Sequence, residues 1–314
     1  MSRRPISKRS ESLPAEPGED VAQGLRRMRL DFEEALETFL SEELEHLPDD
    51  ATGAVRYAVL SPGKRIRPLI LMAAYRALGG DGPEIADLAL SVELVHAYSL
   101  VHDDLPCMDD DVLRRGRPTV HVRYGVAPAV LSGAALMPLA VRAIIRSGFR
   151  LGLDAALVDR LVGVLTLATG ASGMVGGQLL DLRAEGLAVD REQLEQIHTG
   201  KTARLIAACA VMGGIAAGAS EPQLAALERY GLNLGLAFQA VDDILDLRGT
   251  SGQLGKESGR DRDLGKATYP SLFGVEETER ISRGFAEAAI AELDEIGGSD
   301  DLRVIASYVI ERTH

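Results

Sequence analysis

The segment Ser91–Thr119, SVELVHAYSLVHDDLPCMDDDVLRRGRPT, limits what this chain can fold into more than any other. Its first half repeats apolar residues at roughly helical spacing, which predicts a mostly buried helix with Asp103 and Asp104 at its end. Five aspartates lie within residues 103–111, and two adjacent arginines follow them. The segment therefore places a cluster of carboxylates at the end of a core helix.

A second acidic cluster, Phe238–Asp246 (FQAVDDILD), also lies on an apolar background. Asp242 and Asp246 are four residues apart, so they project from one helix face about 40° apart, and Gln239 falls on the same stripe. A solvated acidic loop is the alternative interpretation of the first cluster taken alone. Two aspartate-rich helices in one chain instead indicate a shared metal site.

The chemistry of these clusters indicates which metal and which substrate they would bind. Oxygen-only ligands favour a hard ion, and Mg²⁺ typically uses one or two carboxylates together with waters and substrate phosphates. Phosphate binding also requires cations near the aspartates, and the chain carries them on both sides of the clusters. They are Lys64, Arg65, Arg67, Arg114, Arg115, Lys201, Lys256 and Lys266. We therefore expect a site for diphosphates.

Composition predicts an all-α fold. Of the 314 residues 46% are hydrophobic, aromatic residues make up only 4%, and Trp is absent, which suits close helix packing. Residues 1–20 are polar and rich in Ser and Pro, which predicts a disordered tail, and we expect a single domain over residues 21–314. The net charge of −13 argues against nucleic acid or an anionic membrane surface as partner.

Two cysteines, Cys107 and Cys209, lie far apart without metal-ligand spacing, so we expect reduced thiols in a cytoplasmic protein. The first twenty residues lack the apolar centre of a signal peptide. No uninterrupted apolar run approaches about 18 residues, so stable membrane insertion is not expected.

Two local geometries are predictable. Asp103 and Asp109 are six residues apart, which on a regular helix would rotate the side chains about 120° from each other. Pro106 disfavours helical backbone at the preceding residue, so a break in the helix must bring the two aspartates together. The polar stretch Leu247–Tyr269 is predicted to be a lid over the diphosphate, with a disordered surface loop as the alternative.

Six motifs together resemble the trans-isoprenyl diphosphate synthases, and most closely the bacterial farnesyl and geranylgeranyl diphosphate synthases. The resemblance runs from about Asp31 to the C-terminus, and the motifs occur in the family's order. They are GKRIRP (Gly63–Pro68), DDLPCMDDDVLRRGRPT (Asp103–Thr119), GGQLLD (Gly176–Asp181), HTGKT (His198–Thr202), FQAVDDILD (Phe238–Asp246) and LGKESGRDRDLGKATYP (Leu254–Pro270).

The resemblance implies a helical bundle of the isoprenoid synthase type with a central active-site cavity. It implies head-to-tail joining of isopentenyl diphosphate to an allylic diphosphate such as dimethylallyl or geranyl diphosphate. It also implies Mg²⁺, three ions per active site with substrate bound, and a homodimer. By resemblance, Mg²⁺ is held by Asp103, Asp109 and Asp242. Further ligands or partners of those ligands are Asp104, Asp243 and Asp246.

The remaining roles are also implied by the resemblance. Positions that contact the allylic diphosphate are Arg114, Lys201, Lys256 and Lys266. Positions that hold isopentenyl diphosphate without metal are Lys64, Arg67, His96 and Arg115. Thr202 and Gln239 match positions near the allylic cation, and the released diphosphate is the expected proton acceptor. We assign Gln178, Asp181 and His198 supporting roles only.

Product length is expected to depend on Tyr98, which lies five residues before Asp103, with the small Ser99 beside it. In the family, a bulky ring at the fifth position before the first aspartate closes the end of the cavity. We therefore expect farnesyl diphosphate, with geranylgeranyl diphosphate as the alternative. A second interpretation is that Tyr98 merely fills the core.

One departure from the family pattern is Ala134, where an Asp that orients the lysines is usual, so reduced activity is expected. A catalytically silent partner subunit and a terpene cyclase are the competing functions. The cyclase would normally carry a second motif mixing Asn, Ser and Glu.

Overall fold

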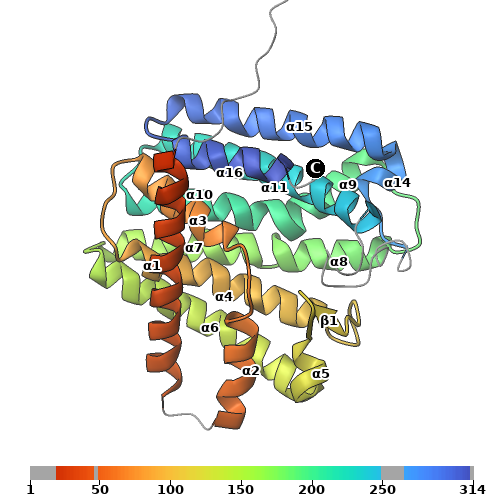
Figure 1. Cartoon of the computed structure of the whole chain (residues 1–314), viewed down its shortest axis with the longest axis horizontal. Helices are drawn as coiled ribbons and strands as arrows, with labels where there is room; N and C mark the ends of the chain where they lie inside the picture. The colour runs from red at the N-terminus through yellow and green to blue at the C-terminus, as the bar shows by residue number, and fades with distance from the viewer. Residues whose placement is uncertain (1–18, 46–48, 249–264, 312–314) are drawn as a thin grey trace, which may run out of the picture.

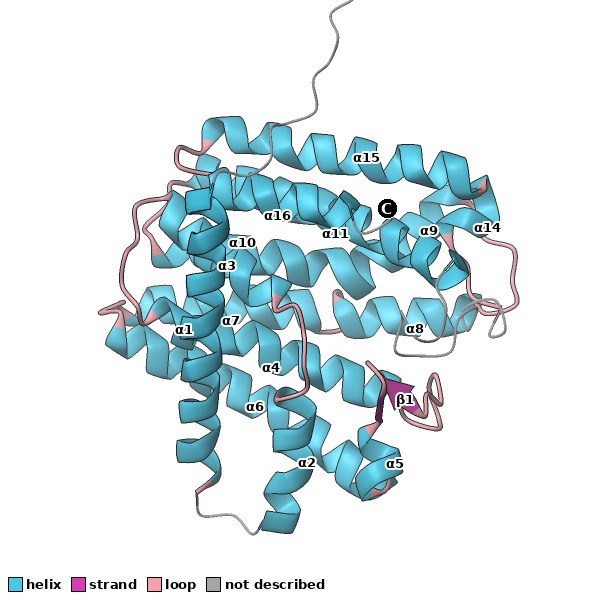
Figure 2. Cartoon of the chain, in the orientation of Figure 1, coloured by secondary structure: helices cyan, strands magenta, loops and turns pink. Residues whose placement is uncertain are grey.

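The structure, a computed structural model, describes residues 19–45, 49–248 and 265–311. Within these ranges the chain is helical apart from turns and one short hairpin, which confirms the all-α prediction (Figure 2). The predicted tail lies outside the described residues except for Glu19 and Asp20, which begin the first helix. Lys256 and most of the predicted lid also lie outside them.

The first half of the chain forms the bottom and middle of the bundle as drawn in Figure 1. Its elements are α1 (Glu19–Leu44), α2 (Asp49–Val59), α3 (Ile66–Ala77), α4 (Ile85–Asp103), β1 (Leu113–Arg114), β2 (Arg117–Pro118), α5 (Val120–Tyr124) and α6 (Val126–Arg150). The second half adds α7 (Ala155–Thr169), α8 (Met174–Ala184), α9 (Arg191–His198), the π-helix η1 (Thr199–Ala203), α10 (Arg204–Ala216), α11 (Glu221–Arg248), α14 (Tyr269–Phe273), α15 (Val275–Glu292), the 3₁₀-helix η2 (Leu293–Glu295) and α16 (Asp300–Glu311).

Helix α4 is the centre of the bundle. Its apolar side chains point to all sides, as expected of a core helix, and Leu88, Leu90 and Leu94 are fully buried. It packs against α1, α2, α3, α6 and α10. Helix α1 runs across the other helices and contacts α3, α4 and α16 (Figure 1). The helix that carries the first aspartate motif is thus held on most of its surface.

The predicted break in the first aspartate motif is present. Helix α4 ends at Asp103, and the chain then turns so that the backbone N–H of Asp109 donates to the carbonyl oxygen of Asp103 at 2.9 Å. Pro106 explains the break, because its ring disfavours helical backbone at Leu105. The turn therefore returns Asp109 to the helix end that carries Asp103.

Small residues let the helices of the second half approach closely. A Cβ on Gly177 would collide with the backbone of Gly200 and Lys201, and a Cβ on Gly235 would collide with Ala203. Glycine at these two positions therefore brings α8 and α11 against the π-helix from two sides.

The hairpin of β1 and β2 turns through Arg115 and Gly116. Their φ angles of 53° and 73° are both left-handed, as a two-residue turn of type I′ requires. The hydroxyl of Tyr57 on α2 donates to the carbonyl oxygen of Pro118 at 2.7 Å and fastens the hairpin to the bundle. Arg114 is therefore the last paired residue of β1, and Arg115 lies in the turn itself.

Two helical stretches, Val126–Arg150 and Ala155–Ala184, are long and apolar enough to cross a membrane by length and composition. Residues such as Gly and Ser interrupt the apolar runs in both stretches, and the expectation that the chain does not insert stably into a membrane stays a prediction. In the structure α6 packs one face against α4 and α7, with Leu136, Ala140 and Ile144 buried there.

Candidate active site

The end of α4 gathers opposite charges from distant segments. The ammonium of Lys266 donates to Oδ1 of Asp109 at 2.9 Å, although the two residues are 157 positions apart. Burial raises the pKa of the Asp103 carboxyl; Lys201 acts against that rise and the neighbouring Asp109 adds to it. Two carboxylates and two ammonium groups therefore share this part of the site.

Asp104, the second aspartate of the motif, forms an ion pair with Arg114. Nε of Arg114 donates to Oδ1 of Asp104 at 2.7 Å, and Nη2 lies 3.3 Å from Oδ2 of Asp111. Burial raises the pKa of Asp104 to about 6 even though Arg114 opposes the rise. In this structure Asp104 holds the arginine that is expected to contact the allylic diphosphate.

The π-helix carries Lys201 and Thr202. A wide turn of this kind is rare and is often found at functional sites. Nζ of Lys201 donates to Oδ2 of Asp181 on α8 at 2.6 Å. Burial opposes the charge of Lys201, but Asp181, Asp103 and Asp109 outweigh it and raise the pKa of the ammonium. Asp181 was expected to have only a supporting role, and the structure makes it the anchor of Lys201.

A chain of hydrogen bonds connects the π-helix with α11 and α14. Oγ1 of Thr202 donates to Oε1 of Gln239 at 2.9 Å, and Nε2 of Gln239 donates to Oδ1 of Asp243 at 2.9 Å. Oδ2 of Asp243 accepts the backbone N–H of Tyr269, also at 2.9 Å. Asp243 is only 2% exposed, so its position in this chain is fixed.

The other two aspartates of the second motif lie on the same helix. Asp242 is half-buried and Asp246 is buried. Burial lowers the pKa of Arg67, and the negative charge of Asp242 is one of the charges that act against this lowering. Within the described ranges no three His, Cys, Asp or Glu side chains converge closely enough to hold an ion. Asp103 and Asp109 do adjoin each other and offer only oxygen donors, which fits a hard divalent cation.

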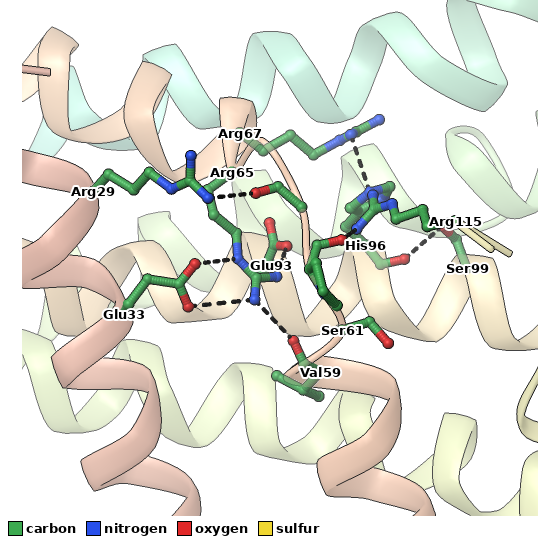
Figure 3. Close-up of polar contacts among 12 residues, drawn as sticks. Arg29, Glu33, Val59, Ser61, Arg65, Arg67, Glu93, His96, Ser99 and Arg115 are labelled. Carbon is green, nitrogen blue, oxygen red and sulfur yellow. Dashed lines mark hydrogen bonds and ion pairs between the residues drawn. The ribbon is translucent and has the colours of Figure 1, made fainter. Parts of the chain in front are cut away.

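A second group of basic residues, separate from Lys201 and Lys266, lies on α3, α4 and the hairpin (Figure 3). Nη1 of Arg67 is 3.5 Å from Nε2 of His96. Burial, followed by the charge of Arg67, lowers the pKa of His96 well below its ordinary value, so the imidazole is neutral. Because arginine can only donate, Nε2 of His96 is the acceptor. Nε of Arg67 is buried and has no hydrogen-bond partner in the described part of the chain.

Lys64 and Arg115 complete this second group. Lys64 is exposed, and its ammonium lies 5.3 Å from the ring centroid of Tyr308 on α16. Nη1 of Arg115 donates to the carbonyl oxygen of Pro62 at 2.6 Å, beside Lys64 in the chain. Arg67 and Arg115 both lie close enough to His96 for their charges to act on it, and Lys64 is three residues before Arg67 with its ammonium toward Tyr308.

Tyr98 lies one helical turn and one residue before Asp103 on α4. Its ring is half-buried and packs edge to face on His102, with ring centroids 4.7 Å apart. Burial, followed by the charge of Asp103, raises the pKa of the Tyr98 hydroxyl. The neighbouring Ser99 hydroxyl donates to the carbonyl oxygen of His96 at 2.9 Å. Tyr98 is therefore close to the metal-motif end of α4 and braced on one side.

Ala134 lies on the exposed face of α6, and the lysines of the site are anchored without it. Lys201 is held by Asp181 and Lys266 by Asp109. The described structure therefore gives no reason to expect that Ala134 disorders these lysines.

Sequence reasoning missed Arg29, Glu33 and Glu93, which surround Arg65 and the loop before it. Spacing could not have identified them, because the contacts join residues about thirty positions apart.

The fold is an all-α bundle whose core helix ends in paired aspartates, beside two separate groups of cations. These features are typical of a class of helical enzymes that bind diphosphates. The family described as polyprenyl synthetase matches residues 49–296. The chain belongs to the polyprenyl synthetase family, a family of prenyltransferases.

The relatives carry several product names. A farnesyl diphosphate synthase of Escherichia coli (strain K12) is 40% identical over 281 residues, which are 87% of this chain and 94% of that protein. A chloroplastic geranylfarnesyl diphosphate synthase of Leucosceptrum canum is 44% identical over 243 residues, 76% of this chain and 66% of that longer protein. Other relatives are named geranylgeranyl pyrophosphate synthases.

Solved structures agree with the fold. A geranyltransferase from Helicobacter pylori, complexed with magnesium and isoprenyl diphosphate, is 30% identical with a TM-score of 0.77. The alignment covers 96% of this chain and 98% of that one.

Proposed function

We propose that this enzyme joins isopentenyl diphosphate head to tail to an allylic diphosphate and releases a short-chain product. The observation that carries this proposal is Arg67, a half-buried residue whose buried Nε–H has no acceptor among the described residues. Leaving such a group without a partner is costly, and an anionic ligand would supply one. Arg67, His96, Lys64 and Arg115 together form a diphosphate site built from cations and a neutral imidazole.

The allylic diphosphate would bind at the other group of cations. Arg114, Lys201 and Lys266 are each held by an aspartate, at 2.7, 2.6 and 2.9 Å. Their positions are therefore fixed before substrate arrives, which is the condition under which charges stabilise a leaving group most. Lys256, which lies outside the described residues, is assigned to the same site from the sequence.

Asp103, Asp109 and Asp242 would hold Mg²⁺, and the number of ions, three, is part of this proposal. Their oxygen donors fit that ion. Burial raises the pKa of Asp103 and the charge of the nearby Asp109 adds to the rise, an arrangement that favours a cation between the two carboxylates. Bound Mg²⁺ would neutralise the charge that collects on the departing diphosphate.

The reaction needs stabilisation of an allylic cation and removal of one proton. Thr202 donates its hydroxyl hydrogen to Gln239, so the lone pairs of its oxygen remain available to face positive charge. The π-bond of isopentenyl diphosphate attacks the cation, and the proton then released passes to the diphosphate that Lys201 and Lys266 retain. No protein side chain has to act as the base.

Farnesyl diphosphate, the C15 product, is the product we propose. Tyr98 lies about 7.5 Å before Asp103 along the axis of α4, and His102 braces its ring. A hydrocarbon tail that grows alongside α4 from the metal motif would meet this ring. The relatives are named for C15, C20 and longer products. Experiment must therefore distinguish farnesyl diphosphate from the alternative, geranylgeranyl diphosphate.

One assay tests the reaction and its product together. Purified protein is incubated with Mg²⁺, radiolabelled isopentenyl diphosphate and dimethylallyl diphosphate, and the dephosphorylated products are separated by chromatography. A C15 alcohol is expected. A C20 alcohol would overturn the product assignment, and no incorporation would instead identify a silent subunit.

A homodimer and a cytoplasmic location belong to the same proposal. The dimer is supported by apolar residues on one face of α6, where Val130 is 40%, Leu131 69%, Ile145 52% and Phe149 88% exposed. An apolar face of this kind is typical of a protein interface. Sedimentation of wild type and of Phe149→Arg tests it. A wild-type monomer of 33.5 kDa at micromolar concentration would contradict it.

A further inference from the structure

The loop between α2 and α3, residues 60–65, carries Lys64 and leads directly into Arg67. Arginines fasten its backbone from two sides (Figure 3). Nη2 of Arg29 on α1 donates to the carbonyl oxygen of Gly63 at 3.1 Å. Nη1 of Arg115 donates to the carbonyl oxygen of Pro62 at 2.6 Å. A Cβ on Gly63 would lie 2.5 Å from the Arg115 guanidinium, so a larger residue would displace that guanidinium.

Arg65 fastens the same loop from within. Its φ of 54° is left-handed, an unusual conformation for arginine, and it directs the side chain toward α1 and α4. The guanidinium donates to Glu93 at 2.5 Å, to Glu33 at 2.9 Å and to the carbonyl oxygen of Val59 at 3.2 Å. With 5% of its surface exposed, Arg65 serves as an anchor rather than a ligand for substrate.

Helix α1 therefore contacts the loop twice, through Arg29 and through Glu33. The two residues are four positions apart, so they lie on the same face of α1. Neither belongs to an aspartate motif, and neither was assigned a role from the sequence. Arg29 is exposed, and its hydrogen bond to the Gly63 carbonyl reaches the loop and not the core.

We propose that α1 is a positioning element for isopentenyl diphosphate, with Arg29 and the Glu33–Arg65 pair as its positioning residues. This inference rests on the proposed function of Lys64 and Arg67. The contacts hold the loop in the conformation that presents both cations. When a binding conformation is only partly populated, apparent affinity falls by the same fraction. Loosening the loop should therefore weaken binding of isopentenyl diphosphate and leave the allylic substrate unaffected.

The test is Arg29→Met, which keeps the aliphatic stem and removes the donors. Its matched control is Arg27→Met on the same helix, which removes an equal charge but breaks only the exposed pair with Asp31, 2.9 Å long. We expect Arg29→Met to raise KM for isopentenyl diphosphate about three- to tenfold, the loss of one hydrogen bond. Both kcat and KM for the allylic substrate should stay within error, and so should Tm.

Arg29→Lys keeps the charge and a donor, and should recover part of the affinity. Glu33→Gln keeps the shape of the side chain and removes the charge that faces Arg65, and should raise the same KM. Equal KM increases in Arg29→Met and Arg27→Met would show a long-range charge effect and overturn the inference, as would an unchanged KM in Arg29→Met.

Failure of the inference is separable from failure of the proposed function. If wild type condenses isopentenyl diphosphate and Arg29→Met matches it, only the role of α1 is wrong. If wild type shows no condensation, calorimetric titration of isopentenyl diphosphate into wild type, Arg29→Met and Arg27→Met without metal still tests the loop. Weaker binding in Arg29→Met alone would support the inference, and equal binding by all three, or none, would overturn it.

Discussion

The ammonium of Lys201 and the carboxylate of Asp181 meet at 2.6 Å, between a π-helix and the neighbouring α8. The two side chains are 23% and 7% exposed, so water screens the pair only partly. Asp181 consequently fixes both the position and the charge of a lysine assigned to the allylic diphosphate. Burial would raise the pKa of Asp181, but Lys201 reverses this and lowers it.

Replacing Asp181 by Asn should therefore weaken the fold and the allylic site together. Removing one partner of a buried ion pair costs about 3–5 kcal/mol, and the partial exposure of Lys201 points to the lower end. We also expect KM for the allylic diphosphate to rise about tenfold or more. Urea unfolding and steady-state kinetics measure the two effects. Glu195→Gln breaks the exposed Arg191–Glu195 pair and should change the free energy of unfolding by less than about 1 kcal/mol.

Asp103→Ala and Asp242→Ala should each nearly abolish turnover with little loss of fold. Both carboxylates are assigned to the metal, and loss of oriented electrostatic stabilisation commonly costs on the order of 3 kcal/mol in the barrier. The measurement is kcat at saturating Mg²⁺, with circular dichroism to monitor the fold. Asp159→Ala, an exposed position on α7, is the control. A kcat near that of wild type in either variant would refute the metal assignment.

The two diphosphate sites should give different kinetic defects. Lys64→Ala and Arg67→Ala are expected to raise KM for isopentenyl diphosphate, because they belong to the group around His96. Lys266→Ala should act through the allylic substrate, because Lys266 is held on Asp109. Initial rates with each substrate varied in turn distinguish the two. An Arg67 variant impaired only toward the allylic substrate would reverse the assignment.

Tyr98→Ala should lengthen the product. The substitution removes a ring that lies on the path of a chain growing alongside α4, and it leaves His102 without its edge-to-face partner. Chromatography of dephosphorylated products from both proteins decides the question. The control is Tyr124→Ala, which removes an aromatic residue at the end of α5 that packs against Tyr57. A variant that still stops at C15 would place the floor of the cavity elsewhere.

His198 should make the fold sensitive to acid. Burial lowers its pKa to about 4, from an ordinary 6.5, so the unfolded chain binds this proton more tightly than the folded protein. The stability it contributes is complete above the ordinary pKa and is lost as pH falls toward 4, by on the order of 2 kcal/mol near pH 5.

His198→Phe tests this directly, since the ring can still stack on Tyr269, whose centroid is 5.2 Å away. Unfolding by urea at about pH 7 and about pH 5 should show a smaller loss in the variant than in wild type. The control is His121→Phe, because His121 lies on α5 and not beside His198 and Tyr269. Equal losses in wild type and His198→Phe would contradict the assignment.

The sequence predicted the parts of this molecule that follow from local pattern. The apolar periodicity before Asp103 predicted a core helix, and Pro106 predicted the break that returns Asp109 to its end. Helix α3 begins at Ile66, and Pro68 falls in its first turn, where proline is tolerated. Side-chain direction was not predictable in the same way. Arg65 and Arg67 look equivalent in GKRIRP, yet one is an anchor and the other faces the site.

Contacts with distant helices determine which of the two arginines is an anchor and which faces the site. Arg65 forms ion pairs with Glu33 and Glu93, and no spacing in the sequence predicts these pairs. The same applies to Asp243, which was grouped with the metal ligands by its motif. Both of its oxygens accept hydrogen bonds, one from Gln239 and one from the backbone of Tyr269. Only the packing of α11 against α14 makes that visible.

The π-helix at Thr199–Ala203 has a consequence for the length of the chain itself. Deleting one residue there would restore an ordinary helix and would remove the wide turn that carries Lys201 and Thr202. The contact of Gly177 with the backbone of Gly200 and Lys201 depends on that turn. The wide turn requires a fixed number of residues, so we expect single deletions in this stretch to be far more harmful than most substitutions.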